Sequence, residues 1–73
     1  MVNPNPSTGH FNIVNPNNEE MSIAVYNILG ELIIENQAIN GDQRIDLGRE
    51  QSGIYILHIV MNGERKSLRI IKQ

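Results

Sequence analysis

The chain has 73 residues and a formal net charge of −2, and its lack of cysteine excludes disulfides and zinc–thiolate sites. A domain of this size buries roughly 60% of the surface that its unfolded chain exposes, which leaves no room for a deep active-site cavity. The few basic residues form no stripe and no apolar run approaches the ~18 residues of a spanning helix, so we expect neither nucleic-acid binding nor membrane insertion.

The first segment, residues 1–9, is predicted to be an extended lead-in, because its prolines fix φ and remove backbone donors. Pro6 to Gly9 supplies a turn before a short strand at residues 10–13. In that strand Phe11 and Ile13 fall on one face, which is the alternation of a half-buried strand.

The second segment, MSIAVYNILGELIIEN, is predicted to be a β-hairpin, because it is rich in Ile, Val and Tyr. Residues 27–30, Asn-Ile-Leu-Gly, fit a type I turn followed by a glycine at positive φ. If that loop closes the hairpin, Val25 lies opposite Ile33 and Tyr26 lies opposite Leu32. The core residues expected from this hairpin are Ile23, Val25 and Ile33.

A second turn at Asn40-Gly41 leads to a short strand that places Ile45 and Leu47 on one face. The polar stretch GREQSG, residues 48–53, then predicts a loop.

The C-terminal segment predicts a second hairpin around Asn62-Gly63, which fits a two-residue type I′ turn. In that register Leu57 faces Leu68 and Tyr55 faces Ile70. The face expected to be core holds Tyr55, Leu57, Ile59, Leu68 and Ile70. Loss of residues 68–73 should unfold the domain, because each buried aliphatic side chain contributes about 1.5–3 kcal/mol to a marginal total.

These elements give an all-β fold. About six to seven short strands with tight turns and no helical segment predict a small antiparallel β-sandwich. Parallel pairing would need longer crossover connections than the chain contains.

A search for catalytic and ligand-binding groups is largely negative. His10 and His58 are isolated, and the serines lack the context of a catalytic triad. No glycine-rich phosphate motif occurs. We therefore expect no enzyme, no cofactor and no metal, with a weak calcium site in the Asn- and Asp-rich loops as the open alternative.

The outer face of the last hairpin offers a candidate binding surface. Ile54, Ile56 and Val60 lie on the face opposite the expected core. They are either covered by loops and the lead-in, or they form a docking patch for another protein. Physical reasoning alone therefore predicts a β domain that works as a binding or recognition module.

Spaced residues along nearly the whole chain carry a family resemblance. They are Asn5, Pro6 and Gly9 of the lead-in, Asn27 and Gly30 of the first hairpin turn, Leu47, Gly53 and Tyr55 around the polar loop, and Lys72 near the end. In this order they resemble the type A C-terminal sorting domain of the bacterial type IX secretion system, found on proteins exported by Bacteroidetes. The polar loop departs from the family pattern, which often has an apolar residue shortly before the glycine.

The resemblance implies a non-enzymatic domain with an immunoglobulin-like β-sandwich, residues 1–73, cut from a larger precursor with its cargo upstream. It also implies recognition by the outer-membrane translocon and its shuttle, and removal by a sortase. The cargo would pass through the periplasm and be secreted or held at the outer-membrane cell surface. A further hypothesis makes Lys72 a charged contact at the exposed end.

The competing hypothesis is a carbohydrate- or protein-binding adhesion module of the same sandwich fold. Glycan sites favour exposed aromatic rings, and the chain has no Trp and places both tyrosines in strands. This composition argues against glycan binding.

Overall fold

The computed structural model describes residues 2–3, 8–15 and 19–73, and these form strands and turns with no helix. The strands are β1 (Val2–Asn3), β2 (His10–Ile13), β3 (Met21–Asn27), β4 (Leu32–Ile39), β5 (Gln43–Asp46), β6 (Gly53–Met61) and β7 (Glu64–Lys72). Within the described residues, no helix has the length and hydrophobicity needed to cross a membrane.

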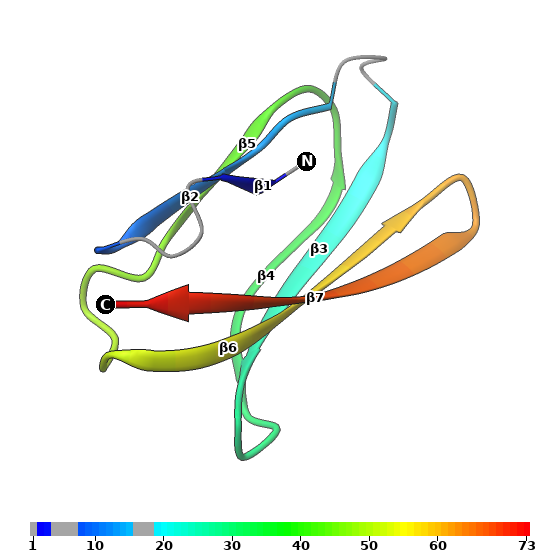
Figure 1. Ribbon diagram of the computed structural model, residues 1–73. Helices are drawn as coiled ribbons and strands as arrows, with labels where there is room; N and C mark the ends of the chain where they lie inside the picture. The colour runs from blue at the N-terminus through cyan, green and yellow to red at the C-terminus, as the bar shows by residue number, and fades with distance from the viewer. Residues whose placement is uncertain (1, 4–7, 16–18) are drawn as a thin grey trace.

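The strands form two antiparallel sheets that pack face to face (Figure 1). The small sheet has the order β1-β2-β5 and the large sheet has the order β4-β3-β6-β7. Alternate residues of each strand point into the space between the sheets. The buried apolar residues are Phe11, Ile13, Met21, Ile23, Val25, Ile45, Leu47, Tyr55, Leu57, Ile59 and Ile70. The prediction of a small all-β sandwich is confirmed.

The C-terminal hairpin has the predicted register. Asn62 has a φ of 54° and Gly63 a φ of 75°, the two positive values that a type I′ turn requires. Leu57 therefore pairs with Leu68, and every residue of β7 has a partner in β6. The two residues of the turn thus determine the register in which the nine-residue strand β7 pairs with β6.

The structure corrects the expected burial of Leu68, which is 39% exposed, whereas Ile70 is fully buried. The small sheet has three strands against four, and β1 contains only two residues. It therefore does not cover the half of β7 nearest the turn. Leu68 lies instead at an open apolar hollow of about 400 Å³ beside Val2 and Val14.

A β-bulge corrects the predicted register of the first hairpin. Tyr26 pairs with Leu32 as expected, but Val25 pairs with Ile34. Ile33 is the extra residue on β4, and such an insertion bends the strand. As a result Ile33 and Ile34 are both only half-buried against the core, whereas Ile23 and Val25 are buried as predicted.

Matched alanine substitutions on β7 separate its buried residue from its exposed one. Ile70→Ala should destabilise the domain by about 2–5 kcal/mol, because it removes a fully buried side chain and leaves a cavity. Leu68→Ala should cost about 1 kcal/mol, because much of that side chain is already in water. Urea unfolding followed by circular dichroism measures both values. Equal losses for the two variants would contradict the burial described here.

Candidate functional site

The loop between β5 and β6 is tied to the start of β2. Leu47 is fully buried, and its N–H donates a hydrogen bond of 2.6 Å to the carbonyl of Gly9. Within the loop, the N–H of Glu50 donates to the carbonyl of Leu47 at 2.9 Å, and the N–H of Gly48 donates to Asp46 Oδ1 at 2.8 Å. Two of the motif residues, Gly9 and Leu47, are thus in direct contact.

Gly9 is required by the close approach of this loop. A Cβ atom on Gly9 would lie 3.3 Å from the Cα of Gly48, which is tighter than ordinary packing. Glycine allows the two backbones to approach because it has no side chain. Gly53, at the start of β6, has a φ of 150°, which also favours glycine.

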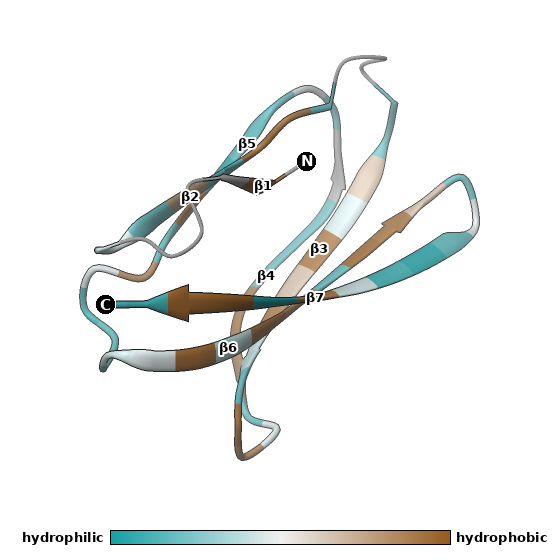
Figure 2. Cartoon of the chain, in the orientation of Figure 1, coloured by the Kyte–Doolittle hydropathy of each residue, from teal (hydrophilic) through white to brown (hydrophobic). Residues whose placement is uncertain are grey.

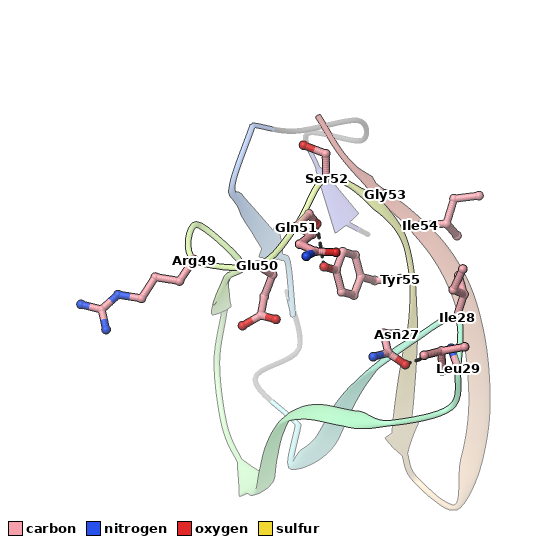
Figure 3. Close-up of a pocket in the computed structure, with 10 residues that line it drawn as sticks. All are labelled: Asn27, Ile28, Leu29, Arg49, Glu50, Gln51, Ser52, Gly53, Ile54 and Tyr55. Atoms are coloured by element: carbon pink, nitrogen blue, oxygen red, sulfur yellow. Dashed lines mark hydrogen bonds between the residues drawn. The ribbon is translucent and has the colours of Figure 1, made fainter.

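Tyr55 binds the same loop from the interior of the sandwich. Its ring is buried, and its hydroxyl donates a hydrogen bond of 2.6 Å to the carbonyl of Gln51 (Figure 3). Burial raises the pKa of the Tyr55 phenol, and the carboxylate of Glu50 raises it further. The folded domain therefore stabilises the neutral hydroxyl of Tyr55, which donates its hydrogen bond to the loop.

Lys72 closes the loop from the last strand. Its half-buried side chain directs Nζ to the carbonyl of Glu50 and, at 3.5 Å, to that of Gly48. The ammonium group therefore holds the end of β7 against the loop. The role of Lys72 as a charged contact stays a prediction.

The turn between β3 and β4 is built by the other motif pair, Asn27 and Gly30. Asn27 Oδ1 accepts hydrogen bonds from the N–H groups of Leu29 at 2.9 Å and Glu31 at 3.0 Å. Asn27 Nδ2 donates to Glu31 Oε1 at 2.8 Å, and the N–H of Gly30 donates to the carbonyl of Asn27 at 3.0 Å. Gly30 has a φ of 86°, so the predicted turn is confirmed.

A cleft of about 470 Å³ lies between this turn and the β5–β6 loop. Residues 27–29 line one side and residues 49–55 line the other (Figure 3). The described motif residues therefore build one end of the sandwich, which we call the motif end.

Exposed apolar side chains gather at the motif end on the outer face of the large sheet. We define the end patch as Ile28, Leu29, Leu32, Ile54, Ile56 and Ile71; all are exposed except Ile56, which is half-buried. Ile54 pairs with Ile71, and a hollow of about 420 Å³ lies between Ile28 and Ile56. The tip of the β3–β4 turn is also hydrophobic (Figure 2).

Val60 lies apart from the end patch, although it shares the outer face with Ile54 and Ile56. It is six residues from Ile54 along β6, which is about 20 Å at the rise of a β-strand. Its partner on β7 is Arg65, so its surroundings are polar. The face expected from Ile54, Ile56 and Val60 is therefore continuous only at the motif end.

Sequence reasoning missed Ile28 and Leu29, which are the most exposed large hydrophobic residues described, at 74% and 81%. The available signal was an Ile-Leu pair at turn positions, where polar residues and glycine are usual. Ile71 was placed on the outer face but left out of the candidate docking patch, although the predicted register of the last hairpin set it opposite Ile54.

The remaining candidate residues form no further site in the described part of the chain. Asn5 and Pro6 lie outside the described residues. His58 is half-buried, and its ring lies 5.0 Å from that of Tyr26. No three His, Asp or Glu side chains among the described residues come together as metal ligands.

Comparison with protein families decides the identity of the domain. The family described as "Secretion system C-terminal sorting domain" matches residues 1–73, which is the whole chain. The chain belongs to this family. No curated protein matches the chain.

Membership places this sorting domain in the type IX secretion system, as the sequence motif predicted. Such a domain is a sorting signal that implies interaction with the secretion machinery and an upstream cargo. It also implies export to the cell surface or out of the cell. In this sorting domain the described motif residues build the framework of the motif end, and other side chains form its apolar surface.

The raised pKa of Tyr55 predicts loss of stability at alkaline pH. Because its folded pKa lies above the ordinary value of 10.0, its contribution is full below pH 10.0 and is lost as the pH rises through the folded pKa. Tyr55→Phe should cost about 1 kcal/mol at neutral pH through loss of the hydrogen bond. The variant should also lose less stability than the wild type above pH 10.0.

Urea unfolding between neutral pH and strongly alkaline pH measures this difference. The two proteins differ only at residue 55, so every other contribution cancels in the comparison. Tyr26→Phe is the matched control, because Tyr26 is less buried and lies on the outer face. Parallel alkaline losses in the wild type and Tyr55→Phe would refute the role given to this hydroxyl.

Proposed function

We propose that this domain directs its attached cargo across the outer membrane by being recognised as a folded β-sandwich. One observation carries the proposal: motif residues from distant parts of the sequence meet only in the folded chain. Leu47 at the start of the β5–β6 loop donates a hydrogen bond to the carbonyl of Gly9. Lys72 donates to carbonyl groups of the same loop. A receptor that binds the motif end would therefore distinguish a folded tail from an unfolded one.

The docking surface in this proposal is the part of the end patch that lies on β6 and β7, which is Ile54, Ile56 and Ile71. Exposed apolar side chains that are grouped together often mark sites of protein interaction. These three come from neighbouring strands of a hydrogen-bonded sheet, so their relative positions are set before binding. Preorganisation of this kind lowers the entropic cost of association.

The position of the N-terminal strand supports this surface. His10, at one end of β2, pairs with Asp46 beside the β5–β6 loop, so this end of β2 lies at the motif end. Val2 pairs with Ile13 at the opposite end of β2, away from the motif end. Strand β1 also lies away from the β3–β4 turn (Figure 1). A cargo joined upstream through β1 would therefore leave the end patch open.

The translocon and its shuttle would bind the motif end, and a sortase would then cut the domain from the cargo. The domain itself would be a non-catalytic signal that needs no cofactor. The cargo would pass through the periplasm and be secreted or remain at the outer-membrane cell surface. Family membership supports this order of events.

A reporter protein fused upstream of residues 1–73 tests the docking surface in a host with this secretion system. Ile54→Thr combined with Ile71→Thr should reduce the exported reporter by at least about tenfold, because it removes two contacts at the centre of the proposed interface. Threonine keeps the β-branched shape, so the folding should be retained. Val60→Thr is the matched control, because it makes the same kind of change on the same face away from the patch.

The same reporter tests recognition of the folded state. Ile70→Asp should abolish export, because a carboxylate in the core unfolds the domain while every patch residue remains in the sequence. Immunoblots of periplasmic and external fractions should show the variant retained inside the cell. Normal export of Ile70→Asp would refute recognition of the fold, and normal export of the threonine double variant would refute this docking surface.

A further inference from the structure

The tip of the β3–β4 turn exposes two large aliphatic side chains that folding does not use. Ile28 and Leu29 are 74% and 81% exposed, although the usual residues of such turns are Asn, Asp, Ser, Pro and Gly. Neither residue belongs to the buried core, so the fold would lose no core contact if both were polar. The pair therefore needs an explanation outside the stability of the domain.

The same tip is held rigidly. Asn27 Oδ1 and Nδ2 both form hydrogen bonds within the turn. Two backbone hydrogen bonds of 3.0 Å close the turn, from the N–H of Gly30 to the carbonyl of Asn27 and from the N–H of Asn27 to the carbonyl of Glu31. Figure 3 shows Ile28 and Leu29 on the same side of the molecule as Ile54. A rigid loop that presents apolar side chains loses little conformational entropy when it is bound.

We propose that this turn is a plug, in which Ile28 and Leu29 insert together into an apolar pocket of a protein component of the secretion machinery. This inference rests on the proposed docking function and names the contact that dominates it. Ile54 and Ile56 then pack against the rim of the pocket beside the plug. At protein interfaces a few central, desolvated residues contribute most of the binding free energy, and Ile28 and Leu29 would be such residues here.

The charges around the tip favour a protein pocket over a lipid surface. Glu31 lies at the base of the turn and Glu50 lines the adjacent cleft, with Arg49 as the cation of that loop. On β7, Arg69 pairs with Ile56 and Lys72 bonds to the carbonyl of Glu50, and neither side chain lines the cleft or the hollow beside Ile28. Figure 3 shows the Arg49 side chain directed away from the turn. Membrane-binding surfaces instead surround their apolar residues with Lys and Arg, which attract anionic lipids.

The same charges disfavour a second copy of the chain as the occupant. A two-fold contact through the tip would bring Glu31 and Glu50 of one copy towards the same residues of the other. A stable interface also buries about 800 Å² on each partner, which is more than a two-residue tip provides. A tip of this size suits a short-lived contact with transport machinery.

Export of the reporter fusion tests the plug directly. Ile28→Ser combined with Leu29→Asp keeps residues that turns favour, so the thermal midpoint of the purified domain should not change. Export should fall by at least about tenfold, because the inserted pair is lost and a carboxylate enters the pocket. Val60→Ser is the matched control, since it removes an exposed aliphatic side chain elsewhere, and it should export normally.

The outcomes separate the plug from the broader docking function. Normal export of the Ile28→Ser/Leu29→Asp variant overturns the plug, and the docking surface still stands if Ile54→Thr/Ile71→Thr blocks export. If both variants are exported normally, both proposals fail. A blocked tip variant that remains folded supports the plug.

Two measurements on the purified chain test the other occupants. Sedimentation with vesicles of phosphatidylethanolamine and phosphatidylglycerol should show no binding that depends on Ile28 and Leu29, and such binding would overturn the plug in favour of a lipid surface. Analytical ultracentrifugation should show a monomer with and without the two substitutions. A dimer lost in the tip variant would overturn the plug in favour of self-association.

Discussion

The C-terminal strand β7 pairs with β6 along its whole length and places Ile70 in the narrow space between the two sheets, where the side chain is fully buried. Two residues further on, Lys72 binds the carbonyl groups of the β5–β6 loop, which in turn bonds to Gly9 at the start of β2. The last strand therefore joins the two sheets both by packing and by hydrogen bonds, and the shape of the motif end depends on it.

The motif residues and the exposed surface have different roles. Gly9, Leu47, Gly53 and Tyr55 set backbone geometry or fill the interior, and Lys72 bonds to backbone carbonyls. The side chains available for contact are others, chiefly those of the end patch. A sorting motif of this kind specifies a framework, and the framework holds the exposed residues in position. Changes to the motif would then affect sorting through folding, whereas changes to the patch would affect it through contact.

Much of the fold follows from local sequence patterns. The Asn62-Gly63 turn allowed the register of β6 and β7 to be predicted, because the geometry of a two-residue turn determines every pair that follows it. Alternation predicted the buried residues of β2 and β5, and the Asn27–Gly30 turn was predicted from its glycine. These features depend on residues that are close in sequence, which is why a single chain was enough to find them.

The errors arose where distant parts of the chain meet. Leu68 alternates like a core residue, but its exposure depends on the width of the opposite sheet, which strand periodicity does not encode. Ile33 was placed in the core because the bulge on β4 has no clear sequence signal. The hydrogen bonds of Lys72 join residues 22 to 24 positions apart, so no local pattern predicts them. The exposed turn residues Ile28 and Leu29 were overlooked because periodicity describes strands and not their tips.

Amide hydrogen exchange measured residue by residue tests the central claim most directly. If β7 joins the two sheets into one cooperative unit, the β7 amides that donate to β6 and the amide of Leu47 should exchange with the same opening free energy as those of β3 and β6. Rapid exchange of these β7 amides, with β3 and β6 still protected, would show that the core closes without its last strand and would contradict the account.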